Sequence, residues 1–245
     1  MQDERSVIRV TGEDAADFLQ GLVTNDVRRL DKGAVYAAML TPQGKYIADF
    51  ILVRHGDAIL IDVARPLAAG LLQRLSMYRL RARVALDLTD IPVARGLGPT
   101  PPDAFADPRH PELGWRAYDG RRGDDADWQA LNVAFCVPQS GVELTPDSFI
   151  LEMGFERLNG VDFRKGCYVG QEVTARMKHK TELRKGLAQV HVEGMAEPGT
   201  EIIAGDKTAG VLYTQSAGLG LAYLRFDRAA GIMQAGAARV QLPQA

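Results

Sequence analysis

Apolar and polar positions in the first third of the chain repeat with two different periods. Alternating or continuous apolar runs predict strands over residues 7–10, 34–40, 46–54, 58–63 and 83–88. Apolar residues at helical spacing predict a helix between Asp14 and Asn25, and a second helix that begins at Pro66. Strands that bracket helices in this order indicate an α+β domain with a mainly antiparallel sheet.

The rest of the chain has a different pattern. Residues 96–127 are rich in Gly, Pro and Asp and predict a long irregular loop. Helices are predicted over residues 128–137 and 148–158. After about Lys185, short β-type runs alternate with glycine-containing turns, which indicates a small all-β barrel or sandwich. These runs are 187–192, 201–204, 209–213, 220–226 and 239–242. We therefore predict two domains, residues 1–183 and 184–245.

Composition and charge narrow the class of protein. The 245 residues are 46% hydrophobic and 24% charged, which is ordinary for a globular protein. A net charge of −2 gives no sign of a nucleic-acid or membrane-surface partner, and no apolar run approaches the ~18–20 residues that span a bilayer. The polar N-terminus lacks the basic-then-apolar order of a secretory signal. We expect a cytoplasmic protein with no direct nucleic-acid or membrane partner.

Cysteine and histidine usage argues against a resident metal. The chain has only two cysteines, Cys136 and Cys167, whereas an iron–sulfur cluster usually takes about four cysteine ligands. The four histidines are scattered, and neither CxxC nor HExxH occurs. We expect no metal site.

The densest candidate chemistry lies between Arg164 and Lys185. Seven basic and two acidic side chains give this segment a local charge of about +5. Cys167 lies within it, beside Lys165 and just ahead of a predicted helix at 170–177, and both neighbours favour a thiolate. A cysteine taken at random is more often a small buried residue. Because its neighbours are polar and flexible, we predict that Cys167 is a functional thiol.

Cys136 has different neighbours. It lies in the apolar run VAFCV, which we place on an apolar helix face. We therefore predict that Cys136 is a core residue.

Residues 165–172, KGCYVGQE, followed by Arg176, resemble the signature K-G-C-Y-x-G-Q-E-x-x-x-R of the YgfZ/GcvT-like folate-binding family. This family includes bacterial members and mitochondrial iron–sulfur assembly factors. Further similar segments are residues 18–27, 41–49, 78–81, 106–109 and 113–116. The resemblance runs through most of residues 5–185 and, more weakly, through the β-rich tail.

The resemblance implies the three-lobed fold of the glycine-cleavage T-protein, an aminomethyltransferase. This fold has a ferredoxin-like lobe, a second lobe over roughly residues 41–91, and a small C-terminal β-barrel. The implied role is a tetrahydrofolate-binding accessory factor in iron–sulfur cluster assembly or repair, serving iron–sulfur enzymes such as tRNA-modifying ones. The implied partners are a reduced folate and client iron–sulfur proteins or assembly factors.

Two other functions stay open. One is an aminomethyltransferase that passes a one-carbon unit to tetrahydrofolate, although the cysteine in the signature favours an accessory factor over a classical enzyme. The other is a nucleic-acid-binding module that uses the basic segment, which the overall acidity disfavours.

The resemblance also implies site residues. Asp49 lies where T-proteins carry the carboxylate that meets the pterin, and a carboxylate accepts paired N–H donors well. Taken alone, an aspartate beside a turn is more often structural. Further implied folate-binding residues are Asn25, Glu152, Tyr168, Gln171, Glu172 and Arg176, with Cys167 and Lys165 as the functional thiol and its basic neighbour. The chain departs from the family pattern at Asn132, Cys136 and Ile150, which replace Arg, Gly and Pro.

Overall fold

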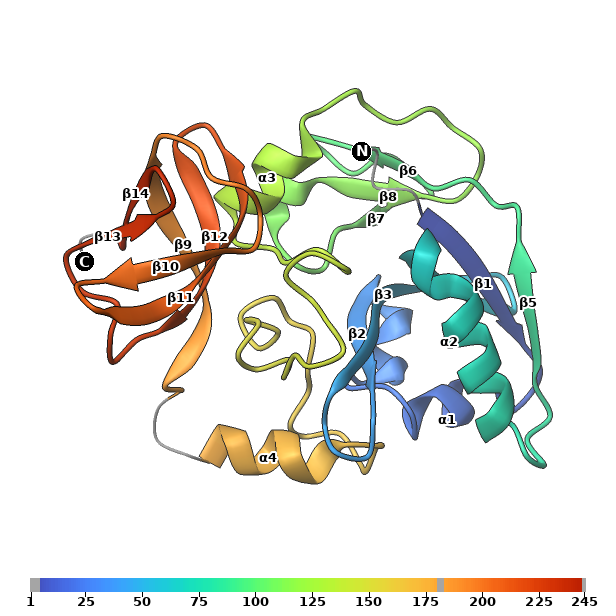
Figure 1. Cartoon of the computed structure of the whole chain (residues 1–245). Coiled ribbons are helices and arrows are strands. Elements are labelled where there is room, and N and C mark those ends of the chain that lie inside the picture. Colours follow the sequence, from blue (N-terminus) through green and yellow to red (C-terminus); the bar gives the residue numbers. More distant parts are fainter. Residues whose placement is uncertain (1–4, 180–182, 244–245) are drawn as a thin grey trace. The chain divides into compact units, whose positions relative to one another are not determined.

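The computed structural model describes residues 5–179 and 183–243 (Figure 1). The chain divides into two compact units. Unit 1 comprises Met1–Ala126 and Phe155–Ala175, and unit 2 comprises Asp127–Gly154 and Arg176–Ala245. The predicted division into domains at 183/184 stays a prediction.

A five-stranded sheet forms the centre of unit 1. Its strands are β1 (Arg5–Thr11), β2 (Val35–Leu40), β3 (Tyr46–His55), β4 (Ala58–Ala64) and β5 (Ala85–Thr89). They lie in the order β2-β3-β4-β1-β5, and every neighbouring pair is antiparallel. The α+β class and the mainly antiparallel sheet are confirmed, and the predicted strands match the observed ones closely.

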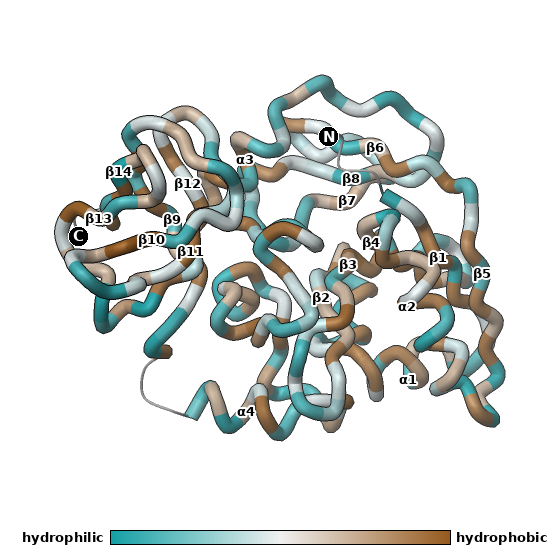
Figure 2. Tube along the Cα trace, viewed as in Figure 1, coloured by the Kyte–Doolittle hydropathy of each residue, from teal (hydrophilic) through white to brown (hydrophobic). Residues whose placement is uncertain are grey.

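Two helices and one face of this sheet share an apolar core. The helices are α1 (Ala15–Gln20) and α2 (Arg65–Tyr78), and a short 3-10 helix, η1 (Val27–Asp31), follows α1. Phe50 of β3 packs in one cluster with Leu19 of α1 and Leu71 of α2. Figure 2 shows the matching apolar stretches in these strands and helices. Burying each such side chain contributes about 1.5–3 kcal/mol.

The opposite face of the sheet carries polar side chains. Successive strand residues point to opposite faces, so Tyr36, Asp49 and Asp62 face away from the residues that pack on the helices. All three are buried. They lie on the adjacent strands β2, β3 and β4, which places the polar chemistry of unit 1 on this face.

The predicted irregular loop, residues 96–127, contributes two strands to a small three-stranded sheet. It consists of β6 (Ala94–Gly96), β7 (Phe105–Ala106) and β8 (Trp115–Ala117) in the order β6-β8-β7, with the 3-10 helix η2 (Pro111–Leu113) between β7 and β8. Arg116 of β8 donates to Asp62 of β4 at 2.8 Å, so this sheet meets the polar face of the large one.

The predicted helix over residues 148–158 is wrong. This segment is a series of turns, and Gly154 within it has φ +79°, which no right-handed helix accommodates. The helix predicted over 170–177 is confirmed as α4 (Gln171–His179). None of the helices in residues 5–179 and 183–243 is long and apolar enough to cross a bilayer.

Unit 2 contains α3 (Trp128–Ala134) and a closed β-barrel. The barrel order is β10-β11-β12-β9-β14-β13. Its strands are β9 (Lys185–Glu193), β10 (Thr200–Ala204), β11 (Lys207–Ser216), β12 (Leu219–Arg225), β13 (Ile232–Ala235) and β14 (Ala238–Gln241). The predicted C-terminal β-barrel is confirmed. The strand β13 was missed because its residues, IMQA, do not alternate between apolar and polar.

The placement of Cys136 on an apolar helix face is wrong. The helix α3 ends at Ala134, and Cys136 follows it with φ +51°, in the left-handed region that favours glycine. The side chain is only partly buried. This conformation also explains why a glycine suits the position better than a cysteine.

Candidate functional site

Asp49 lies at the centre of the polar face and is held by two tyrosines. Its Oδ1 accepts a hydrogen bond from the Tyr46 hydroxyl at 2.7 Å, and its Oδ2 accepts one from the Tyr36 hydroxyl at 3.0 Å. The Asp49 residue is only 4% exposed. Asp49 pairs with Ala38, and Tyr36 lies two residues before Ala38 on β2, on the same face of the sheet; Tyr46 precedes Asp49 on β3 itself. Two tyrosines of the β2–β3 hairpin therefore orient the Asp49 carboxylate.

The phenol of Tyr36 is a hydrogen-bond donor to Asp49. Burial raises the pKa of Tyr36 well above its usual range, and the negative charge of Asp49 raises the pKa further. Tyr36 therefore stays protonated and remains a donor at neutral pH. A carboxylate offers about four acceptor positions, and the two phenols occupy at least two of those of Asp49. Such a group suits a ligand edge that carries N–H donors.

Asn25 holds β2 against a turn of the 155–160 segment. Its Nδ2 donates to the Tyr36 carbonyl at 2.8 Å and to the Asn159 carbonyl at 2.7 Å, while its Oδ1 accepts from the Asp26 amide. Asn25 thus positions the strand that carries Tyr36. Its role toward a ligand stays a prediction.

Lys165 anchors the signature segment to the end of helix α1. Its Nζ donates to the carbonyls of Gln20 and Val23 at 2.6 Å each, and lies 4.8 Å from the centre of the Tyr168 ring. Desolvation lowers the pKa of Lys165 to about 8. The Nζ group points at two backbone carbonyls at the end of α1, where a cation also offsets the helix dipole. The Cys167 side chain, two residues on, is exposed.

The two motifs that carried the family resemblance lie against each other. Gly170 has φ +85°, and a Cβ on it would come 2.6 Å from the Thr41 carbonyl oxygen. Gly44 has φ +76°, and a Cβ on it would come 2.8 Å from the Cβ of Val173. The hairpin turn at 41–45 therefore packs on the start of α4, at a distance that only glycine permits.

The remaining predicted residues of the signature lie on or beside α4. Tyr168 is buried, and its carbonyl accepts from the Gln171 amide at 3.2 Å. Gln171 is half-buried, whereas Glu172 and Arg176 are exposed. Their predicted ligand roles stay predictions.

Glu152 belongs to unit 2. Its Oε2 accepts from the Tyr223 hydroxyl at 2.6 Å, and its carbonyl accepts from the Leu187 amide. Burial and this carboxylate raise the pKa of Tyr223 far above its usual range. Asn132, also in unit 2, is buried, and its Oδ1 has no hydrogen-bond partner among the residues that the structure describes.

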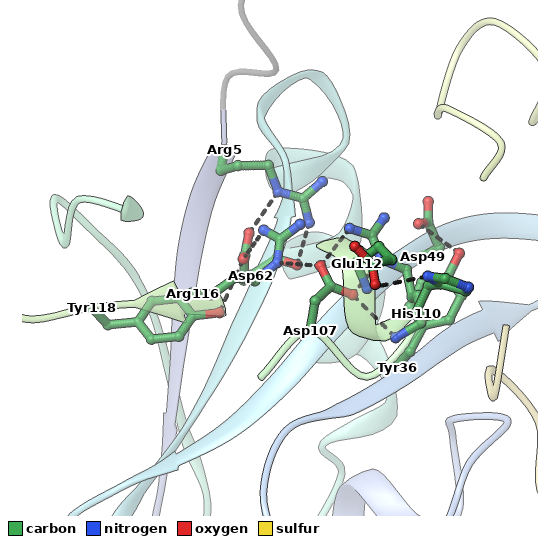
Figure 3. Close-up of polar contacts among 10 residues, drawn as sticks. Arg5, Tyr36, Asp49, Asp62, Asp107, His110, Glu112, Arg116 and Tyr118 are labelled. Atoms are coloured by element: carbon green, nitrogen blue, oxygen red, sulfur yellow. Dashed lines mark hydrogen bonds and ion pairs between the residues drawn. The ribbon is translucent and has the colours of Figure 1, made fainter. Parts of the chain in front are cut away.

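A buried charged cluster around Asp62, on the polar face, was not predicted from the sequence. Figure 3 shows Asp62 among Arg5, Arg116 and Tyr118, with Asp107 beyond Arg116. Burial alone would raise the pKa of Asp62, but the positive charges of Arg5 and Arg116 outweigh it and hold that pKa below its usual range. One signal was present in the sequence. Asp62 interrupts the apolar strand AILIDV, and a charge in such a place needs buried partners.

Within residues 5–179 and 183–243, no group of three or more His, Cys, Asp or Glu side chains is arranged to hold a metal ion. The described residues offer a buried carboxylate with phenolic donors at Asp49 and, on the signature segment, a desolvated lysine anchor and an exposed thiol.

Comparison with solved structures defines the class of fold. The chain matches the aminomethyltransferase T of the glycine cleavage system from Bartonella henselae with a TM-score of 0.74, at 12% identity, over 98% of this chain and 83% of that one. Two family models also match, the GCVT N-terminal domain over residues 3–88 and the CAF17 C-terminal beta-barrel domain over residues 184–244. The fold is thus that of the T-protein, as the sequence predicted.

Comparison with characterised sequences identifies the family. The chain is 30% identical to the mitochondrial iron–sulfur cluster assembly factor IBA57 of Homo sapiens, over 94% of this chain and 78% of the human protein. It is 29% identical to the mouse protein over the same shares of the two chains, and 32% identical to the Mycosarcoma maydis homologue over 74% of this chain and 54% of that protein. The chain belongs to the IBA57 family of GcvT-like iron–sulfur cluster assembly factors.

The comparison corrects one prediction. We expected a cytoplasmic protein, but the relatives from human, mouse and Mycosarcoma maydis are all named as mitochondrial. The prediction rested on the order of a secretory signal, which is unrelated to the amphipathic, arginine-rich pattern of mitochondrial targeting.

Proposed function

We propose that this chain is an iron–sulfur cluster assembly factor that binds a reduced folate at Asp49. One observation carries the assembly role: the chain matches human IBA57, which is named for that role, over 94% of its own length. The partners are then client iron–sulfur proteins or other assembly factors, and tRNA-modifying iron–sulfur enzymes are among the proposed clients.

The chemistry of Asp49 supports the folate part of the proposal. The pterin of tetrahydrofolate presents an amino group and a ring N–H on one edge, and a carboxylate held in one orientation accepts both. The two phenols supply that orientation here. Other proposed contributors to the folate site are Asn25, Glu152, Tyr168, Gln171, Glu172 and Arg176.

Cys167 is proposed as the functional thiol of the assembly role. Its side chain is exposed, and the flanking residues Lys165 and Tyr168 are buried and fix the segment beneath it. This arrangement presents a thiol to a partner from a rigidly held loop. Lys165 acts in the proposal as the anchor of that loop.

Complementation in cells that lack the native protein tests the assembly role. The wild-type chain is expected to restore the activity of iron–sulfur enzymes, and Cys167→Ser to restore little of it. Cys136→Ser is the matched control and is expected to behave like wild type. A folded wild-type chain that restores nothing would refute the assembly role. Full restoration by Cys167→Ser would show that the thiol has no part in the assembly role.

An aminomethyltransferase is the second candidate, because the GCVT N-terminal model and the solved T-protein both match. It is tested by supplying an aminomethylated carrier protein and tetrahydrofolate and measuring methylenetetrahydrofolate. We expect no turnover. Sustained product formation that Asp49→Asn abolishes would favour the enzyme over the accessory factor.

A further inference from the structure

The ring of Tyr36, whose hydroxyl donates to Asp49, is also contacted by an arginine. The guanidinium carbon of Arg109 lies 5.7 Å from the ring centre, and Phe155 stacks on the ring at 4.9 Å between centroids. A guanidinium within about 6 Å of an aromatic face is attracted to it. The phenol that orients Asp49 is therefore itself held by a charged neighbour.

Arg109 is fixed in turn by a chain of buried ion pairs. Its Nε and Nη2 donate to the two oxygens of Asp107 at 2.9 and 2.7 Å. Arg116 donates to Asp107 at 3.1 Å and to Asp62 at 2.8 Å, and Arg5 donates to Asp62 at 2.6 Å. We refer to these five residues as the arginine cluster. Bidentate pairing of this kind sets the plane of a guanidinium as well as its place.

The arginine cluster has a surplus of positive charge. It contains three guanidinium groups and two carboxylates, all buried or nearly so. A surplus buried charge is costly unless a countercharge lies near. Asp49 supplies a negative charge at the hydroxyl end of Tyr36. Arg109 also acts on the phenol itself, since its positive charge opposes the rise in the pKa of Tyr36 that burial and Asp49 cause.

We propose that Arg109 is a positioning residue of the Asp49 site, which acts through Tyr36. It holds the ring and polarises the O–H bond, so that the phenol donates firmly to Oδ2 of Asp49 and keeps the carboxylate in its ligand-accepting orientation. The effect of Arg109 on ligand binding rests on the proposed binding of a reduced folate at Asp49. The coupling of Arg109 to the phenol does not.

The chain contains its own control for this proposal. Asp119 and Arg121 repeat the Asp-x-Arg spacing of Asp107 and Arg109, with Nε of Arg121 donating at 2.9 Å. The Arg121 guanidinium also lies over an aromatic ring, 5.9 Å from the centre of Trp115. Asp119 and Arg121 pair with each other outside the arginine cluster, and both are more exposed than their counterparts. Arg121→Gln is therefore a matched variant that should leave the site unchanged.

A double-mutant cycle with tetrahydrofolate, followed by calorimetry, tests the proposal. Arg109→Gln and Tyr36→Phe are each expected to weaken binding about tenfold, and the double variant to bind no more weakly than Tyr36→Phe alone. Arg109→Lys keeps a positive charge beside Asp107 and replaces Arg109→Gln if that variant does not fold. We expect Arg109→Lys to bind tetrahydrofolate about threefold more weakly than wild type. Additive losses in the double variant, or an equal loss in Arg121→Gln, would overturn the proposal.

A measurement on the free protein separates this inference from the folate proposal. With tyrosine labelled by ¹³C at Cζ, the resonance that Tyr36→Phe removes is that of Tyr36. We expect Arg109→Gln, or Arg109→Lys if only that variant folds, to shift this resonance, and Arg121→Gln to leave it in place. If the wild type binds no tetrahydrofolate, the folate proposal fails, and the Tyr36 resonance alone then tests the coupling of Arg109 to Tyr36. An unshifted resonance would overturn the role of Arg109.

Discussion

Replacing Gly170 by alanine tests whether the signature segment is built around its contact with the 41–45 hairpin. The left-handed φ of +85° costs an alanine about 1–2 kcal/mol. The new Cβ would also lie 2.6 Å from the Thr41 carbonyl oxygen, and relieving such an overlap costs about 1–3 kcal/mol. The sum, about 2–5 kcal/mol, is large against the roughly 5–15 kcal/mol that stabilises a typical protein.

Gly166, four residues earlier in the same signature, is the control. A Cβ on Gly166 would meet nothing within 4 Å, and its φ is not in the left-handed region. Urea denaturation of the whole chain should therefore show Gly166→Ala within about 0.5 kcal/mol of wild type and Gly170→Ala far below it. Equal losses in the two variants, or no loss in Gly170→Ala, would refute the close packing of the two motifs.

Three further predictions follow from local geometry and charge. Cys136→Gly should raise the free energy of unfolding by about 0.5–1 kcal/mol in urea, because glycine adopts φ +51° without strain; a loss would contradict this. Iodoacetamide at neutral pH should modify the exposed Cys167 before Cys136, as measured by mass spectrometry. The reverse order would show that the Cys167 thiol is not accessible. The folded pKa of Lys165, lowered from 10.5 to about 8, lies below its unfolded value, so the unfolded chain binds more protons between these pH values. Stability should therefore rise with pH across that window in wild type relative to Lys165→Met, and parallel pH curves would refute the desolvated lysine.

The sequence predicted the parts of the fold that local pattern determines. Strands β1 to β4 alternate or run apolar over six or more residues, and Pro66 marks the start of α2, so these elements were found nearly to the residue. The turns at 150–159 were mistaken for a helix because their apolar spacing resembles one, while the left-handed Gly154 that prevents it leaves little trace in the pattern.

Less of the site could be predicted, because its contacts join residues far apart in the chain. Asp49 was found from its motif, but its partner Tyr36 is set by the pairing register of β2 and β3. Lys165 was expected beside a thiol, yet its ammonium reaches back 142 residues along the chain to the Val23 carbonyl. Such pairings depend on the folded topology, which residue spacing does not encode.

Titration of tetrahydrofolate into the purified chain tests the central claim most directly. Calorimetry is expected to show binding to wild type, and Asp49→Asn to bind roughly tenfold to a hundredfold more weakly, since the variant amide would present donors to the pterin's donors. Asp87→Asn is the control, because Asp87 lies exposed on β5 and pairs only loosely with Arg9, and it should bind like wild type. Equal affinity in folded Asp49→Asn and wild type, or no binding to wild type at all, would contradict a folate site at Asp49.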